Sequence, residues 1–273
     1  MSDLQSWEDA VRGLLSRPDQ AALVDACYFD QPLAVAAARY HSSAEWTALS
    51  AEIAAKPGRA LDLGAGNGIA SYALARDGWT VDAVEPDPSG LVGAGAIRGL
   101  AQAENLPITV VEAFGEALPF APASFDLVVA RQVLHHAVSL ADLCAEIARL
   151  LRPGGQLLAV RDHVVSGPEQ LAAFHDRHPL HRLYGGEHAY TLSEYRSAIT
   201  SAGLAIDREI RSLDSPINLA PMTPESLARR IPFAGKAIES IVGGGRFWKV
   251  APLLSRFDRR PGRLVTYICR KPA

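Results

Sequence analysis

The stretch Ala60-Leu61-Asp62-Leu63-Gly64-Ala65-Gly66-Asn67-Gly68 decides the fold, because in it a short apolar strand runs into a glycine-rich turn that opens a helix. Glycines at positions 64, 66 and 68 let the backbone approach a ligand where a Cβ would intrude. A dinucleotide fingerprint has its third glycine one residue later, where this chain has Ile69. The spacing therefore predicts an adenosyl ligand other than NAD.

A second predicted strand, Thr80-Val81-Asp82-Ala83-Val84-Glu85, ends in a carboxylate, and Pro86 limits its extension. In doubly wound sheets ligands lie outside the carboxyl ends of the strands, and an acid at the tip of the second strand accepts hydrogen bonds from the ribose hydroxyls. We therefore expect Glu85 to bind the ribose of a cofactor that carries no 2′-phosphate.

Strands and helices alternate along the middle of the chain, which predicts an α/β fold with a doubly wound parallel sheet. Strands are expected near 60–63, 80–85, 108–112, 125–130 and 155–161, with helices near 67–77, 88–103 and 138–151. Helices are also expected over 6–15, 34–55 and 192–202, and strands near 204–211 and 263–269. We divide the chain into a helical N-terminal cap segment (1–57), a cofactor-binding core (58–161) and a lid or substrate region with the last strands (162–273).

Composition excludes several classes of function. The 273 residues are 48% hydrophobic and 21% charged, with a net charge of −3, so the balance predicts no nucleic-acid partner. Three distant cysteines without a CxxC pair favour a reducing compartment. With no apolar run of membrane-spanning length and no basic leader, we expect a cytoplasmic protein without a membrane partner.

Six motifs follow one another along the chain: 61–68, Glu85, Leu118-Pro119-Phe120, Phe125-Asp126-Leu127-Val128-Val129, Leu134-His135-His136 and Leu150-Leu151-Arg152-Pro153-Gly154-Gly155. In this order they resemble class I S-adenosylmethionine (SAM) dependent methyltransferases. The likeness is greatest to the small-molecule group related to quinone biosynthesis, also called type 11. It covers roughly residues 58 to 161 and implies a seven-stranded, mostly parallel sheet whose last strand inserts antiparallel. It also implies SAM as cofactor and a small-molecule acceptor methylated on O, N or activated C, by a monomer or homodimer.

The resemblance implies a set of cofactor contacts. Asp62 is expected to contact the ammonium of SAM, directly or through water. Tyr40 is expected to fold over the methionine end, with plain helix packing as the alternative. The full set is Tyr40, Asp62, Gly64, Ala65, Gly66, Gly68, Glu85, Pro86, Phe114, Gly115, Glu116, Arg131 and Gln132.

Two places depart from the family pattern. Relatives usually carry an acid that accepts from the adenine amino group two positions before the equivalent of Glu116, and this chain has Phe114 there, followed by Gly115. Phe114 either flanks the adenine, leaving Glu116 or a backbone carbonyl as acceptor, or belongs to the core. After the fourth strand, Arg131 and Gln132 replace the carboxylate of a Mg²⁺-binding catechol site. Arg131 is expected to pair with the SAM carboxylate, or else with a surface acid.

Five of the eight histidines lie between 163 and 188. A metal site on His175, His178 and His181 would need one helix, which Pro179 disfavours, so we expect no metal. We instead expect a lid hinged at Gly185-Gly186 that supplies a general base, in the order His188, His163, His181, Tyr184, although structural roles are as plausible for any one of them. For His135 and His136 we favour structural roles over catalysis.

Three functional readings follow. The first is methyl transfer from SAM to a small molecule. The second is a SAM-binding protein of the same fold with other chemistry or a non-catalytic role, because fold does not fix function. A nicotinamide dehydrogenase is a distant third, disfavoured by Ile69.

Overall fold

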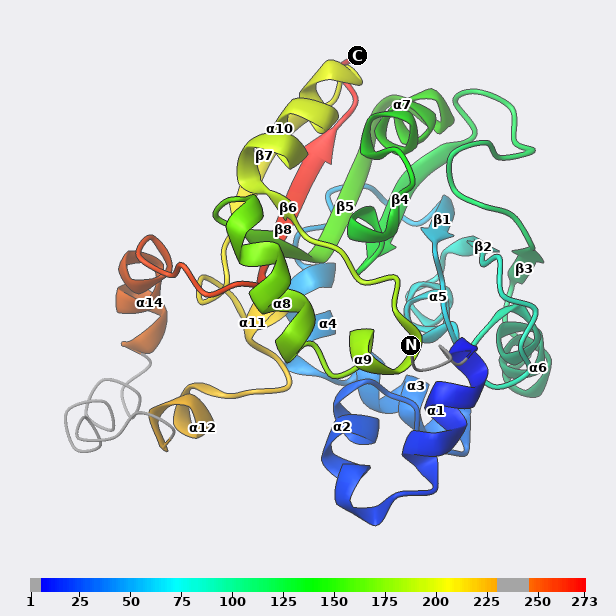
Figure 1. The fold of residues 1–273 in the computed structure, drawn as a ribbon. Coiled ribbons are helices and arrows are strands. Elements are labelled where there is room, and N and C mark those ends of the chain that lie inside the picture. Colours follow the sequence, from blue (N-terminus) through cyan, green and yellow to red (C-terminus); the bar gives the residue numbers. More distant parts are fainter. Residues whose placement is uncertain (1–5, 230–245) are drawn as a thin grey trace.

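The computed structural model describes residues 6–229 and 246–273 (Figure 1). Its centre is a mixed sheet with strand order β3-β2-β1-β4-β5-β8-β7, and the short β6 pairs with β5 off this path. The strands are β1 (Arg59–Leu63), β2 (Thr80–Val84), β3 (Ile108–Val111), β4 (Phe125–Arg131), β5 (Leu151–Val165), β6 (Tyr190–Thr191), β7 (Ala205–Ile210) and β8 (Arg263–Arg270).

The pairing confirms the predicted fold class. β3, β2, β1, β4 and β5 are mutually parallel, as alternating strands and helices require. β8 runs antiparallel between β5 and β7, the place expected for the last strand. β5 is much longer than the predicted 155–161. It carries an irregularity between Ala159 and Asp162 in its pairing with β8, and bulges of this kind often lie beside functional sites.

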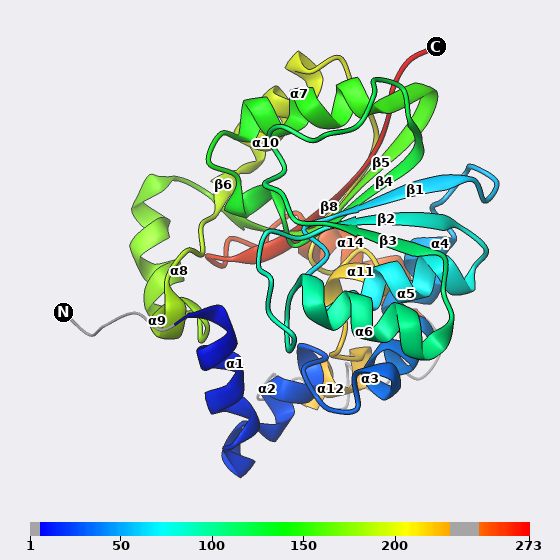
Figure 2. The ribbon, with the colours of Figure 1, turned by 90° about the vertical axis from the view of Figure 1, so that its right-hand side faces the viewer.

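Helices cover both faces of the sheet, as Figure 2 shows. α7 (Leu140–Leu150) and α10 (Leu192–Ser201) pack on one face, where Leu143, Ile147 and Ile199 join one buried cluster. On the other face, α3 (Leu33–His41), α4 (Ala44–Ser50) and α5 (Ile69–Arg76) share a second cluster. α6 (Ala94–Glu104) lies on that second side and buries Ile97 against Ala65 and Ala83.

Two predicted helices differ from the structure. The helix expected over 34–55 is two helices, α3 and α4, because the Ser43 hydroxyl accepts the Trp46 N–H and starts a new one. The helix expected from residue 88 begins only at Ala94, since Ser89 accepts N–H groups of the loop before it. The run Gly243-Gly244-Gly245, whose composition predicts a flexible connection, lies outside the described part of the chain.

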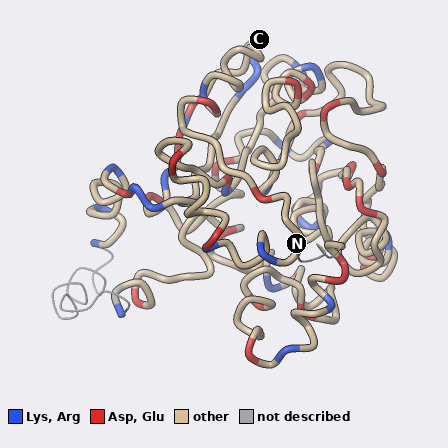
Figure 3. The backbone as a smooth tube through the Cα atoms, viewed as in Figure 1, with Lys and Arg blue, Asp and Glu red and all other residues tan. Residues whose placement is uncertain are grey.

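The remaining elements are short. Side chains from two of them meet: the ring of Trp7 in α1 lies 4.6 Å, centroid to centroid, from that of Tyr184 in α9. Within the described ranges, every helix is too short or too polar to cross a lipid bilayer. Acidic and basic residues are both scattered over the tube in Figure 3. These elements are α1 (Trp7–Leu15), η1 (Pro18–Gln20), α2 (Ala21–Ala26), η2 (Leu134–His136), η3 (Pro168–Gln170), α8 (Leu171–Arg177), α9 (His181–Tyr184), α11 (Pro216–Leu219), α12 (Pro224–Arg229) and α14 (Phe247–Ser255).

Candidate functional site

A cavity of about 630 Å³ opens at the carboxyl ends of the parallel strands. It is lined by residues that end or follow β1, β2, β3, β4 and β5, by Trp7 and Phe29 from the N-terminal segment, and by residues of 178–187. Its size falls in the range of about 300–1,000 Å³ that holds small ligands. All three predicted regions of the chain therefore contribute to one site.

The glycine turn forms one wall. Gly64 and Gly66 have φ angles of +62° and +55°, in the left-handed region that side chains disfavour. A Cβ on Gly64 would lie 2.6 Å from Val133 Cγ2, so the turn packs tightly there. A Cβ on Gly66 would meet nothing within 4 Å, and Gly66 lines the cavity. The lack of a side chain at Gly66 thus leaves space for a ligand, whereas at Gly64 it allows Val133 to pack closely against the turn.

Two buried carboxyl groups flank the turn. Glu85 directly follows β2, and its two oxygens accept the N–H groups of Gly66 at 2.7 Å and Asp87 at 3.0 Å. Burial is the largest cause of its shift and raises the pKa of Glu85 to about 7. Asp62 accepts a hydrogen bond from Ser71 Oγ at 2.5 Å, and burial raises its pKa to about 6. Ligand groups that donate hydrogen bonds would stabilise both ionised forms.

The loop after β3 resolves one open alternative. Phe114 is 73% exposed and lines the cavity, so it does not belong to the core. A Cβ on Gly115 would lie 2.7 Å from Leu143 Cδ1, which explains the small residue there. Glu116 accepts the N–H of Val138 at 3.0 Å. The loop therefore presents an aromatic ring and a carboxylate at the rim.

Arg131 is held inside the protein. Its Nε donates to Glu45 Oε1 at 2.7 Å, and Arg161 Nη1 lies 3.4 Å from the other Glu45 oxygen. The ion pair of Arg131 is therefore buried, not at the surface. Tyr40 lies beneath it, with its ring 5.2 Å from the guanidinium. Tyr40 is fully buried and is not among the residues that line the cavity, so its expected contact over the cofactor is not seen.

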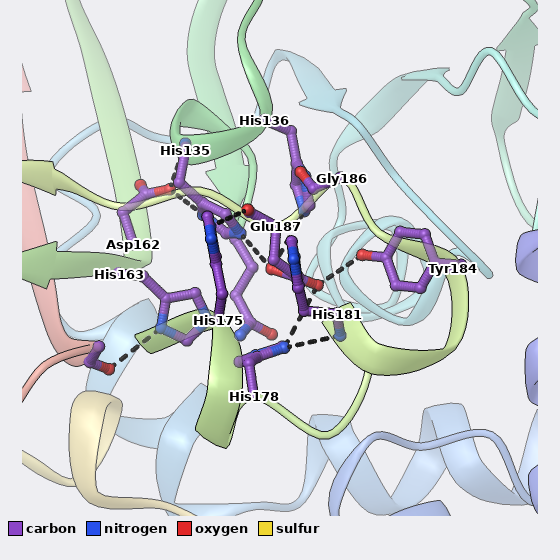
Figure 4. A network of polar contacts seen from close by, with 12 residues as sticks. His135, His136, Asp162, His163, His175, His178, His181, Tyr184, Gly186 and Glu187 are labelled. Carbon is purple, nitrogen blue, oxygen red and sulfur yellow. Dashed lines mark hydrogen bonds and ion pairs between the residues drawn. The ribbon is translucent and has the colours of Figure 1, made fainter. Parts of the chain in front are cut away.

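A polar group lies at another part of the cavity wall (Figure 4). We call His135, Asp162, His163 and Glu187 the histidine cluster. Asp162 Oδ1 accepts the backbone N–H of His135 at 3.1 Å and lies 2.9 Å from its Nδ1, so Nδ1 carries a proton. Nε2 of His135 lies 3.3 Å from Glu187 Oε2. Burial alone would lower the pKa of His135, but the two carboxylates outweigh it and raise the pKa to about 9.

His163 and Glu187 complete the cluster. His163 Nδ1 donates to the Gly262 carbonyl at 3.1 Å, and burial lowers the pKa of His163 to about 3, so it is neutral with a free Nε2. Glu187 is only 6% exposed. One of its oxygens accepts the Tyr184 hydroxyl, while Oε2 is buried without a hydrogen bond in the described structure. Contacts to neighbouring histidines keep the pKa of Glu187 low despite its burial.

Comparisons with known proteins agree with this geometry. Residues 61–159 match the model of a methyltransferase domain. Ubiquinone biosynthesis O-methyltransferase from Xylella fastidiosa (strain M23) is 29% identical over 142 residues, which cover 52% of this chain and 57% of that protein. Residues 61–159 are therefore similar to known methyltransferase domains. The chain spans little more than half the length of the curated relatives it matches first.

Solved structures share the methyltransferase fold. Geranyl diphosphate methyltransferase in complex with SAM superposes with a TM-score of 0.59 at 16% identity, covering 95% of this chain and 94% of that one. The [4+2]-cyclase SpnF superposes with a TM-score of 0.57 at 19% identity, covering 89% and 82%. At such identities the likeness is one of fold alone, and the second of these proteins is a cyclase.

Most predicted cofactor residues gather in the cavity. Gly68 does not line it: Gly68 has a φ of +86°, and a Cβ there would press on Ile97 at 3.1 Å. Gly68 therefore serves the turn and the packing of α6. The predicted residues that do line the cavity are Asp62, Gly64, Ala65, Gly66, Glu85, Pro86, Phe114, Gly115, Glu116, Arg131 and Gln132.

The predicted bases divide into two pairs. His163 and Tyr184 line the cavity, whereas His188 and His181 do not. His188 packs on the ring of Tyr190 with centroids 4.5 Å apart, so the first-ranked base is not placed at the cavity wall. His181 stacks on His175 at 4.0 Å.

The helical metal triad does not form as one helix. α8 ends at Arg177, and His178 is extended, with φ −74° and ψ 116°, as expected for a residue before Pro179. Asp162 and Glu187 were not among the sequence candidates. Asp162 and His163 directly follow the predicted end of the fifth strand, where ligands of such sheets lie, and that position was the available signal.

Proposed function

We propose that this protein transfers the methyl group of SAM to a small-molecule acceptor. The observation that carries the proposal is a single cavity that joins the glycine turn and Glu85 to the histidine cluster. The domain match and the relatives named as methyltransferases support it. The geometry gives such a reaction two neighbouring compartments, one suited to an adenosyl group and one suited to a polar nucleophile.

In this proposal Glu85 accepts hydrogen bonds from the ribose hydroxyls and Asp62 faces the ammonium of SAM. Phe114 flanks the adenine at the rim. The sulfonium is a strong electrophile, so the protein's main work is to align nucleophile, methyl carbon and sulfur and to exclude water. The acceptor's oxygen or nitrogen forms the new bond to carbon, and the C–S electron pair stays on sulfur as S-adenosylhomocysteine (SAH) forms.

The acceptor is proposed to enter at the histidine cluster. Of the four predicted bases, His163 both lines the cavity and is neutral, so its Nε2 can accept a hydrogen bond from an acceptor O–H or N–H. Tyr184 is less suited, because its proton is donated to Glu187, and burial raises the pKa of Tyr184. His188 is set aside, because it lies away from the wall.

Calorimetric binding of SAM followed by assay of SAH release tests the proposal. We expect SAM to bind, and SAH to appear with at least one acceptor from a panel of phenols, hydroquinones and amines. Glu85→Ala should weaken SAM binding by about 1–3 kcal/mol, because the ribose hydroxyls lose their acceptor. Glu209→Ala, whose carboxylate pairs with Arg196 away from the cavity, is the control. SAM binding without turnover across the panel would instead favour the non-methyl-transfer alternative.

A further inference from the structure

Three side chains of the histidine cluster bring possible ligand atoms close together. One ring nitrogen each of His135 and His163 and one oxygen of Glu187 all lie within 4.8 Å of each other, the one such group found among the described residues. All three side chains are buried and line the cavity. Oε2 of Glu187 is buried and accepts no hydrogen bond, and its contact with His135 Nε2 at 3.3 Å is an ion pair. This oxygen can therefore take a further partner.

Each imidazole is held in the orientation that a metal ligand needs. His135 Nδ1 donates to Asp162 and His163 Nδ1 donates to the Gly262 carbonyl, so on both rings Nε2 is the nitrogen that remains for a metal ion. Metal-binding histidines almost always donate their second N–H to a carboxylate or a backbone carbonyl in this way. Here the Asp162 carboxylate supports the His135 ring and the Gly262 carbonyl supports the His163 ring.

We propose that His135, His163 and Glu187 bind a divalent transition-metal ion of the Zn²⁺ or Co²⁺ class. Two imidazole nitrogens and one carboxylate suit such ions, whereas Mg²⁺ prefers oxygen ligands. With bonds of about 2.1 Å, ligand atoms of a tetrahedral site lie about 3.4 Å apart. His135 Nε2 and Glu187 Oε2 are already at 3.3 Å, so binding requires mainly a small movement of His163.

The surroundings allow a competing interpretation. His135 lies between two carboxylates, and an imidazolium there would form an ion triplet without any metal. Two further groups approach Glu187: His136 Nε2 at 3.9 Å from Oε2 and His178 Nδ1 at 3.8 Å from Oε1. Neither is as close as His135. In the ion triplet, His163 Nε2 is left for the hydrogen bond from the acceptor proposed above, whereas in the metal site His163 Nε2 binds the ion and the ion contacts the acceptor instead.

The open coordination positions of such an ion would face the cavity, which, if the proposed methyl transfer is correct, is where the acceptor binds. An ion held by these residues would let a bound hydroxyl give its proton to water at a lower pH than a free hydroxyl does. The resulting oxyanion would be the nucleophile of the methyl transfer proposed above, in which the C–S electron pair stays on sulfur. A metal ion at this place would therefore favour acceptors in which a hydroxyl lies next to a second oxygen that can bind the ion.

Co²⁺ titration of the untagged, EDTA-stripped protein tests the site, because bound Co²⁺ gives visible absorption bands. We expect one saturable equivalent of Co²⁺ that Zn²⁺ displaces and Mg²⁺ does not. Glu187→Gln and His163→Ala should abolish it. Asp162→Asn, which weakens the support of His135, should cost about 10–100-fold in affinity. His41→Ala removes a histidine that pairs with Asp77, remote from the group, and should change nothing.

Thermal unfolding and SAH binding are measured on the same samples, so a misfolded variant is recognised. If Glu187→Gln unfolds, His163→Ala carries the test. Absence of saturable Co²⁺ binding by the parent, or equal binding by folded Glu187→Gln, overturns the metal site and leaves the ion triplet. Failure to bind SAH while Co²⁺ still binds would instead count against the proposed function.

Discussion

The two compartments of the cavity are built in different ways. The cofactor side comes from short stretches at strand ends, where Gly66 donates its N–H to Glu85 across two neighbouring parallel strands. The histidine cluster draws side chains from η2, β5 and the loop after α9. The first compartment depends on backbone shape and the second on side chains converging from distant positions. Changes in the two should therefore have separable effects.

The largest effect is expected from Gly66→Val. A branched side chain there enters the cavity without meeting protein, so we expect SAM binding to fall more than about 100-fold. The left-handed backbone also costs about 1–2 kcal/mol of stability with any side chain. Calorimetry measures the affinity and urea unfolding the stability.

Gly154→Val separates strain from blockage. Gly154 has φ +77°, and a Cβ there also meets nothing within 4 Å, but it does not line the cavity. It should lose stability to a similar extent and keep its SAM affinity. Equal loss of SAM binding in the two variants would show that strain, not occupied ligand space, is responsible.

A pH effect of about 3 kcal/mol is expected from Glu85. Its pKa is raised from 4.5 to about 7 by burial. Below pH 4.5 the carboxyl is protonated in both states. Between 4.5 and 7 it ionises only in the unfolded chain, which then binds fewer protons, so stability falls as pH rises. Above pH 7 the loss of stability is complete. Each unit of the pKa shift corresponds to about 1.4 kcal/mol in the free energy of unfolding.

Glu85→Gln removes this titration. Urea unfolding of the SAM-free proteins should therefore show the variant gaining on the parent by about 3 kcal/mol between pH 4.5 and 7.5. A stability difference that is constant over this range would mean that Glu85 is solvated in the absence of cofactor.

The side of the cavity that holds the glycine turn and Glu85 was easier to predict because its sequence signals are local. The glycine turn, Glu85 at the tip of β2 and the place of the last strand were readable from consecutive residues or from the family pattern. Even the break of α8 before Pro179 followed from a rule about one dipeptide. Such features depend on the backbone preferences of a few neighbours.

The histidine side was harder because it depends on long-range placement. His188 was the first-ranked base, but no local signal says which histidine of 163–188 faces the cavity. The pairing of His135 with Asp162 spans 27 positions and needs η2 to lie beside an elongated β5. Tyr40 is also decided by long-range placement. It is an aromatic residue of the kind expected over the cofactor, but its ring packs against Trp46 and does not line the cavity.

Asp162→Asn is expected to affect only the second compartment. It leaves the buried His135 imidazole without its charged acceptor, so the free energy of unfolding should fall by about 1–3 kcal/mol. SAM affinity should stay within about twofold of the parent. Asp207→Asn is a matched control, because Asp207 pairs with Arg270 at the surface, where such pairs contribute about 0–1 kcal/mol. A large loss of SAM affinity in Asp162→Asn would mean that the compartments are coupled.

The smallest effect is expected from Phe114→Ala. The ring is 73% exposed, so its removal should leave stability unchanged. If it flanks the adenine, losing one aromatic contact should weaken SAM by about 0.5–1.5 kcal/mol, or about 2- to 12-fold. Phe257, which is 74% exposed and does not line the cavity, gives a matched control in Phe257→Ala. If Phe114→Ala binds SAM as tightly as the parent, the adenine is bound by Glu116 and the backbone alone. This loop would then differ from the family pattern in its hydrogen-bond acceptor, and stacking on Phe114 would play no part.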